Sequence, residues 1–280
     1  MSVAIVAGDR LVGGLARLEP LAAAIFAGDL RRRGWLARKL ERECVDPAAS
    51  ALLLREADDV GESIELEQVA GYVLIGRSPS LGALARGAGV GVLPALRGRG
   101  IGATLIDAAC RRAAERGVAA LEFLAEPERL AWYLRMGFEP IRSEWTLQAE
   151  ASGERDEFTW AGELAPRGAC VWSWIREAWL RTPTAERGWL ASSRPGVELR
   201  AWASREGRAV LIHRFELGEP ARSRELETIV DALNQVRAGL PRGTPVLLYP
   251  CAAQRPWSRA LLGAGWTIAQ RSWVVRRALI

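Results

Sequence analysis

Residues Val90 to Ala103, VGVLPALRGRGIGA, have the composition and spacing of a site that binds a diphosphate. A β-rich segment leads into a glycine-rich turn, and an amphipathic helix follows directly. Glycine has no Cβ, so successive backbone N–H groups of such a turn can point toward one ligand. The helix start adds unpaired N–H groups and the positive end of the helix dipole. Arg97 and Arg99 add positive charge, and the stretch therefore predicts an anion-binding turn.

Three classes of phosphate-binding turn can be compared with this stretch. The GxxxxGK[ST] pattern of nucleoside-triphosphate loops is absent. The pattern Gly98-x-Gly100-x-x-Ala103 fits the dinucleotide fingerprint, and Glu122 follows at a suitable distance to bind a ribose. Pro94 speaks against a dinucleotide fold, because proline is disfavoured in a central parallel strand. The third class of turn is recognised only together with a second motif that lies downstream.

That second motif is AWYLRMGF, residues 131–138, which resembles the A-x-x-[FL]-Y-x-x-x-G-F signature of the Gcn5-related N-acetyltransferases, the GNAT family. The turn Arg97-x-x-Gly100-x-Gly102 resembles the acyl-CoA pyrophosphate loop of the same family. Loop and signature occur in the family's order and separation, so the pair is more specific than either motif alone. The resemblance covers residues 1–150 well and residues 165–280 weakly.

The resemblance implies an α/β (α+β) fold of two GNAT-like domains, each a mixed twisted sheet flanked by helices. In the N-terminal domain it implies two strands that splay apart, the first of which pairs with the pantetheine arm of acetyl-CoA. Glu126 replaces an asparagine that the family often carries, and its carboxylate can still accept a hydrogen bond from an amide. The cofactor-binding residues implied are Val90, Gly91, Val92, Arg97, Gly98, Arg99, Gly100, Ile101, Gly102, Glu126 and Tyr133.

Tyr133 matches the family tyrosine that protonates the departing CoA thiolate. The chemistry is sound in itself, because a thiolate leaving group needs a proton and a nearby phenol can donate one. The alternative is a core aromatic residue on an amphipathic helix. The acceptor amine must also lose a proton, and the candidate base is Glu122 at the splayed strand. Glu65 and Glu67, expected on one strand face, are further carboxylate candidates.

The resemblance therefore predicts an acetyl-CoA-dependent N-acetyltransferase that works by direct attack of the amine, with acetyl-CoA as co-substrate and no metal. The expected partner is a small-molecule or peptide amine acceptor, with no membrane and no specific nucleic acid, and a homodimer is compatible with the sequence. Two alternatives stay open. A non-catalytic acyl-CoA-binding or regulatory module would explain the lack of a clear general base, and a dinucleotide-binding enzyme would explain the glycine fingerprint.

The composition is that of a folded cytoplasmic protein. The 280 residues correspond to about two domains at ~150 residues each, and 49% are hydrophobic. No apolar run is long enough for a membrane span, and the N-terminus lacks a secretory signal pattern. The net charge of +5 comes from dispersed basic residues, which favours anionic small ligands over nucleic acid. The four cysteines are far apart and predict neither a zinc site nor a disulfide framework.

Hydrophobic periodicity and turn residues predict alternating helices and strands around the turn. Helices are expected within residues 15–26, from Trp35 to about Cys44, from Ala103 to Arg116 and from Pro127 to Gly137. Strands are expected at Ala51–Arg55, Val69–Ile75, Ala88–Leu93, Ala120–Leu124 and Ile141–Leu147.

A polar, aperiodic segment at residues 149–166 predicts two domains, 1–149 and 165–280, joined by a linker at 150–164. The string RGWLA occurs at residues 33–37 and again at 187–191. Gly137-Phe138, with a tryptophan eight residues after the glycine, returns as Gly265-Trp266 with the same spacing. These similarities predict an internal duplication, with chance similarity as the alternative.

The second copy is expected to keep the fold without the cofactor site. Its equivalent of the turn, residues 218–227, has no glycine after Gly218 and carries three glutamates that would repel a pyrophosphate. The position of Tyr133 falls near Leu261, which has no proton to donate. His213 lies in an apolar run and is expected to be a buried core or interface residue.

Overall fold

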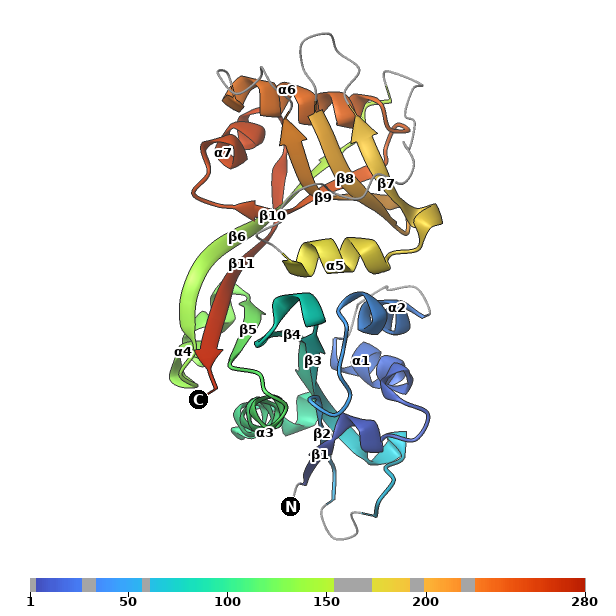
Figure 1. The fold of residues 1–280 in the computed structure, drawn as a ribbon, viewed down its shortest axis with the longest axis vertical. Helices are drawn as coiled ribbons and strands as arrows, with labels where there is room; N and C mark the ends of the chain where they lie inside the picture. The colour runs from blue at the N-terminus through green and yellow to red at the C-terminus, as the bar shows by residue number, and fades with distance from the viewer. Residues whose placement is uncertain are drawn as a thin grey trace. The chain divides into compact units, whose positions relative to one another are not determined.

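The structure, a computed structural model, describes residues 4–26, 34–56, 61–153, 173–191, 199–217 and 225–279. Contacts divide the chain into two compact units. Unit 1 comprises Met1–Ala125, Arg129–Pro140 and Val275–Ile280, and unit 2 comprises Glu126–Glu128 and Ile141–Val274. Figure 1 shows the elements of each unit and the C-terminus at the end of a strand of unit 1.

Unit 1 is a mixed sheet with helices packed against it. Strands β1 to β4 pair antiparallel in sequence order, β4 then pairs parallel with β5, and the end of β11 lies next to β5. The helices are α1 (Glu19–Ile25), α2 (Trp35–Arg42), α3 (Ile101–Glu115) and α4 (Leu130–Arg135), and the strands are β1 (Ile5–Ala7), β2 (Ala51–Leu54), β3 (Val69–Arg77), β4 (Leu84–Val92), β5 (Ala120–Ala125) and part of β11 (Thr267–Ala278).

Alternation along β3 divides the core of unit 1 between two faces of the sheet. Tyr72 and Leu74 belong to a buried cluster that also contains Leu21 and Ile25 of α1. Successive side chains of a strand point to opposite faces, so Val73 lies on the other face. Helix α3 packs against β2, β3 and β4. The antiparallel pairing of β1 to β4 excludes the doubly wound parallel sheet that the dinucleotide alternative requires.

Most of the elements expected for unit 1 are confirmed. Strands β3 to β5 and β6 (Glu139–Glu150) are longer than the patterns indicated, and β2 is one residue shorter. Strand β4 begins at Leu84, four residues before the expected start, and β6 exceeds its expected range at both ends. The short strand β1 was not expected. A local sequence pattern contains no information about which strands pair. It therefore could neither exclude the parallel dinucleotide fold nor give the limits of these strands.

Unit 2 repeats the order of pairing seen in unit 1. Strands β7, β8 and β9 pair antiparallel in sequence order, β9 pairs parallel with β10 for three residues, and β10 pairs antiparallel with β6. Residues of α6, α7 and the sheet share one buried cluster. The elements are α5 (Ser173–Arg181), α6 (Glu225–Ala238), α7 (Pro256–Gly263), β7 (Arg187–Ala191), β8 (Leu199–Glu206), β9 (Ala209–Leu217), β10 (Pro245–Ala252), most of β6 and the beginning of β11.

The helix–turn–strand anchor of the predicted duplication is confirmed. Gly137 and Gly265 both have a positive φ, 78° and 87°, directly before a long final strand. The N–H of Phe138 donates to the carbonyl oxygen of Tyr133 at 3.2 Å, and the N–H of Trp266 donates to that of Leu261 at 3.1 Å. Leu261 therefore takes the position of Tyr133 in the second copy.

The prediction that the two RGWLA strings occupy equivalent positions is wrong. In the first copy Trp35 begins α2 after Gly34, whose φ is 77°. In the second copy the same letters form β7, whose residues pair with β8 from Arg187 to Ala191. Partners elsewhere in the chain decide the secondary structure of so short a string, and Trp35 and Trp189 are not equivalent positions.

The division by contacts differs from the expected domain limits. Residues 141–149 group with unit 2, and residues 275–280 group with unit 1. Of the expected linker, residues 154–164 lie outside the described residues. The domain limits 1–149 and 165–280 therefore stay a prediction.

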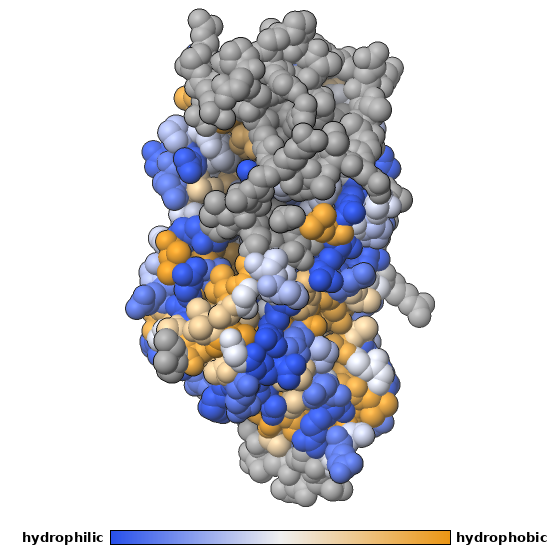
Figure 2. All heavy atoms as spheres, viewed as in Figure 1, coloured by the Kyte–Doolittle hydropathy of each residue, from blue (hydrophilic) through white to orange (hydrophobic). Residues whose placement is uncertain are grey.

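The visible face of unit 1 shows hydrophobic residues in several patches between hydrophilic ones (Figure 2). Exposed large hydrophobic side chains such as Phe26 and Leu134 are ordinary on a folded domain, because polar groups cannot cover its whole surface. Among the described residues, no helix combines the length and the apolar composition needed to span a lipid bilayer.

Candidate functional site

Strands β4 and β5 pair over a short distance and then separate. Residues 84–86 of β4 pair with residues 120–122 of β5. Beyond them β4 continues to Val92, and it stays paired with β3 on its other side over that whole length. The side of β4 that faced β5 is therefore an open backbone edge from Gly87 to Val92. This is the splayed pair of strands expected from the sequence.

The open edge presents backbone groups of Val90 and Val92. The N–H of Leu93 donates to the carbonyl oxygen of Ala70 at 2.9 Å, so Leu93 points its backbone groups toward β3. In an antiparallel ladder this direction alternates from residue to residue. The backbone N–H and carbonyl groups of Gly91 therefore also face β3, and those of Val90 and Val92 face away from it. The carbonyl oxygen of Val92 accepts a hydrogen bond from Nε of Arg97 at 3.0 Å, which leaves the Val92 N–H at the edge.

A β-bulge precedes the open edge. Leu74 pairs with Gly89 and Ile75 pairs with Gly87, so Ala88 is an extra residue in β4. The N–H of Ile75 donates to Oγ of Ser50 at 3.0 Å, a side-chain bond that satisfies a backbone donor at the irregular position. Ser50 thus anchors β3 next to the bulge, on the side turned away from β4, where the N–H of Asp46 also donates to the carbonyl oxygen of Ile75 at 2.8 Å.

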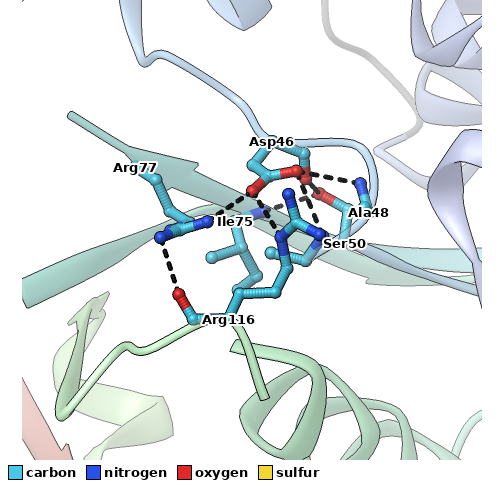
Figure 3. Close-up of polar contacts among 7 residues, drawn as sticks. Asp46, Ala48, Ser50, Ile75, Arg77 and Arg116 are labelled. Atoms are coloured by element: carbon cyan, nitrogen blue, oxygen red, sulfur yellow. Dashed lines mark hydrogen bonds and ion pairs between the residues drawn. The ribbon is translucent and has the colours of Figure 1, made fainter. Parts of the chain in front are cut away.

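Asp46 anchors Ser50 and the end of α3 (Figure 3). Oγ of Ser50 donates to the carbonyl oxygen of Asp46 at 2.8 Å. The Asp46 carboxylate accepts hydrogen bonds from Arg77 of β3 and from Arg116 after α3, both at 2.9 Å. Burial of Asp46 would raise the pKa of its carboxyl, but the hydrogen bonds from the two arginines outweigh it and hold that pKa below its ordinary value.

An aromatic cluster lies where β4 and β5 separate. A Cβ placed on Gly87 would fall 2.5 Å from Cζ of Phe123 and closer still to two other ring carbons, so only glycine fits beneath this ring. The ring of Phe123 lies 5.5 Å from that of Tyr133 and 5.6 Å from that of Phe138, centroid to centroid. Tyr133 is 4% exposed. The cluster therefore fixes Tyr133 next to the beginning of the open edge.

The glycine-rich turn has the backbone geometry of an anion site. Gly98 and Gly100 both have φ +77°, and no atom lies within 4 Å of a Cβ placed on either. Helix α3 begins at Ile101, and the N–H groups of residues 98–102 have no hydrogen-bond partner among the described residues. Gly102 packs against Trp132, 3.3 Å from an ideal Cβ. Five donors beside a helix start can meet a diphosphate.

The two arginines of the turn differ in their contacts. Nε of Arg97 donates to the carbonyl oxygen of Val92, and its Nη2 donates to that of Ile25 at 2.6 Å. Arg97 therefore ties the turn to β4 and to the end of α1, a structural use that was not expected. Arg99 is exposed and has no partner among the described residues, so its charge is available to a ligand.

The candidate carboxylates are not gathered in one place. Glu122 is 7% exposed, and its Oε1 accepts hydrogen bonds from Nε and Nη2 of Arg276 at 2.9 and 2.5 Å. Glu126 is exposed and makes no hydrogen bond with the described residues. The expectation that Glu65 and Glu67 share a strand face is wrong. They lie at a 3₁₀ turn, Leu66–Gln68, because Glu65 caps this turn with Gln68 and ends the extended segment.

Outside this region the expectation for His213 is confirmed. His213 is 7% exposed, and its Nε2 lies 2.8 Å from Oγ of Ser204, so it is a buried, hydrogen-bonded residue of unit 2 as expected. The described part of the chain contains no group of three or more metal-ligating side chains that could hold a metal ion.

Sequence reasoning missed Gly87, Phe123 and the Arg276 contact. The alternating glycines of the segment GAGVG, residues 87–91, were a usable signal, since glycine inside a strand often marks a bulge or a close approach. No local signal could have paired Glu122 with a residue at the far end of the chain.

Comparison with known proteins gives a consistent result. Residues 53–140 match the sequence model of the acetyltransferase (GNAT) domain. A GCN5-related N-acetyltransferase of Sphaerobacter thermophilus superposes with TM-score 0.63 and 17% identity over 99% of this chain and 96% of that one. A tandem GNAT protein of the clavulanic acid biosynthesis pathway superposes with TM-score 0.60 and 14% identity over 100% and 99% of the two chains.

A third similar structure is a putative acetyltransferase of Pyrococcus horikoshii, with TM-score 0.57 and 13% identity over 99% of this chain and 89% of that one. At such identities these structures establish the fold alone. The curated proteins give no match.

Proposed function

Because the chain carries a GNAT domain at residues 53–140 and has the tandem GNAT fold along its length, we propose that it transfers an acetyl group from acetyl-CoA to an amine. The observation that carries the proposal is the open edge of β4 from Gly87 to Val92, which leads directly into the glycine-rich turn. A chain of free backbone donors along an edge and a turn suits a ligand with amides at one end and a diphosphate at the other.

The residues present fit acetyl-CoA. The backbone groups of Val90 and the N–H of Val92 would pair with the pantetheine amides, and the N–H groups of residues 98–102 would hold the diphosphate. Arg99 would add charge to that contact. The positive φ and open surroundings of Gly98 and Gly100 support this assignment, because a ligand can approach the backbone there without meeting a side chain.

Acetyl-CoA supplies a thioester, whose carbonyl carbon an amine nitrogen attacks while the bond to sulfur breaks. A backbone N–H at the open edge of β4 would stabilise the negative charge that develops on the carbonyl oxygen. Tyr133 would donate its phenolic proton to the departing thiolate. The proton lost by the attacking nitrogen would pass to water, and water would return a proton to the Tyr133 phenolate. The aromatic cluster supports this role, since it holds the ring of Tyr133 in one place beside the edge.

A second candidate is a non-catalytic acyl-CoA-binding module. It is favoured by the ion pair of Glu122 with Arg276, which engages the carboxylate expected to act as general base. On this second view the edge and the turn would bind the ligand, and no amine would be acetylated.

The experiment that separates the two is a thiol-release assay with acetyl-CoA and a panel of amines. We expect release of CoA with at least one amine, and a fall in kcat of about 10²-fold or more in Tyr133→Phe, as for loss of a general acid. The Kd for acetyl-CoA should hardly change. Tyr249→Phe, the same substitution in unit 2, is the matched control. Tight binding with no thiol released by any amine would favour the binding module.

A further inference from the structure

The end of the chain is part of the unit that carries the candidate site. Residues 275–280 group with unit 1, although all its other residues precede Ile141. The C-terminal part of β11 lies beside β5, and the N–H of Leu279 donates to the carbonyl oxygen of Ala119 at 2.9 Å. Val275 is 0% exposed. Figure 1 shows the C-terminus at the end of β11.

Arg276 bonds to the residue at which β4 and β5 separate. Its Nε and Nη2 both donate to Oε1 of Glu122, which is 7% exposed. Glu122 is in the last residue pair of the two strands, opposite Arg86. The next residue of β5 is Phe123, whose ring covers Gly87 at the beginning of the open edge. A buried carboxylate requires its partner, so Arg276 stabilises the strand at this position.

Arg277 points to the opposite face of β11, because neighbouring side chains of a strand alternate. Its Nη1 donates to Oδ1 of Asp107 on α3 at 2.5 Å. Its guanidinium lies 5.9 Å from the ring centroid of Phe138. Phe138 in turn packs edge-on against Tyr133, with 5.4 Å between the ring centroids. Arg277 thus links the helix that begins at the glycine-rich turn with the aromatic cluster.

We propose, resting on the proposed function, that the C-terminal end of β11 is a positioning segment of the acetyl-CoA site, acting through Arg276 and Arg277. Arg276 holds Glu122 and with it the separation of β4 from β5. Arg277 holds Phe138 against α3 and thereby fixes the ring of Tyr133. Neither arginine touches the reacting atoms. Residues far outside the matched GNAT domain therefore complete the site.

The test uses the small number of tyrosines in the chain. The three tyrosines, Tyr72, Tyr133 and Tyr249, would give three fluorine resonances in the full-length protein labelled with 3-fluorotyrosine, each assigned by its Tyr→Phe variant. The variants are Arg276→Met and Arg277→Met. The matched control is Arg271→Met, which removes an exposed arginine of the same strand that has no partner among the described residues.

We expect both variants to shift or broaden the Tyr133 resonance and to leave that of Tyr249 unchanged. A displacement of the ring should lower kcat about tenfold or more, because small misplacements of a catalytic group are costly. The control should change neither. Arg276→Lys should recover part of the loss, since lysine keeps the charge but not the two-nitrogen contact.

A wild-type Tyr133 resonance in the folded Arg276→Met and Arg277→Met proteins would overturn the proposal. Should these variants not fold, the Arg276→Lys and Arg277→Lys proteins answer the same question, and a wild-type resonance in both would overturn it equally. The resonance does not depend on turnover. If wild-type protein released no thiol while the arginine variants still displaced the Tyr133 signal, the proposed function alone would fail.

Discussion

Among the described glycines of unit 1, Gly87 is the one at which an added methyl group is expected to disturb the site most. The new Cβ would fall 2.5 Å from Cζ of Phe123 and nearer to two other carbons of that ring. Ordinary carbon contacts are about 3.5–4.0 Å, so the ring must move by about 1 Å or more. Phe123 is 3% exposed and its ring packs against those of Tyr133 and Phe138, so a movement of the ring disturbs both neighbours.

Overpacking of this kind typically costs about 1–3 kcal/mol of folding stability. A displacement of about 1 Å at a catalytic group can lower kcat about 10²-fold. The assay is urea unfolding together with steady-state thiol release, measured at a temperature where the variant is fully folded. The matched control is Gly263→Ala in α7, where a Cβ meets no atom within 4 Å. That change should leave both quantities nearly unchanged.

The double variant Gly87→Ala with Phe123→Leu should recover part of the stability, because the smaller side chain makes room and neighbouring substitutions are not additive. Wild-type stability and kcat in Gly87→Ala alone would refute the claim that the Phe123 ring packs tightly on Gly87 and fixes Tyr133 beside the open edge.

Two further substitutions test the turn and its support. Arg99→Glu should weaken acetyl-CoA binding about tenfold, as measured by calorimetry. Arg111→Glu makes the same charge change about 15 Å along α3, at 1.5 Å per residue, and should have little effect on binding. Equal losses of affinity in the two variants would contradict a local contact of Arg99 with the ligand. Asp46→Asn should cost about 1.5–3 kcal/mol near neutral pH, since charged hydrogen bonds from Arg77 and Arg116 are lost. The pKa of Asp46 is lowered in the folded protein, so its carboxylate stabilises the fold at pH values above the pKa of the unfolded chain. This stabilisation disappears as the pH falls through the pKa of the folded protein. The free energies of unfolding of wild type and Asp46→Asn, measured in urea, should therefore converge in acid.

The parts of the site that were predicted are those encoded locally. The turn from Arg97 to Gly102 and the helix that follows depend on consecutive residues, whose glycines and helix start define their own geometry. The position of Tyr133 follows from α4 and the glycine after it, and the same turn recurs at Leu261. Such features need no knowledge of distant partners.

The parts that were missed depend on pairing across the chain. RGWLA is a helix at Trp35 and a strand at residues 187–191, since only the second string has β8 beside it. Glu122 was expected as the candidate general base, and its ion pair with Arg276 joins residues on β5 and β11. Periodicity describes one element at a time, so neither outcome was available from the sequence.

The most direct test of the account is titration calorimetry of the full-length protein with acetyl-CoA, followed by the same titration of Arg99→Glu. The account predicts one binding site per chain, weakened in the variant, and no competition from NAD. No heat from acetyl-CoA, or tight binding of NAD at this turn, would contradict it.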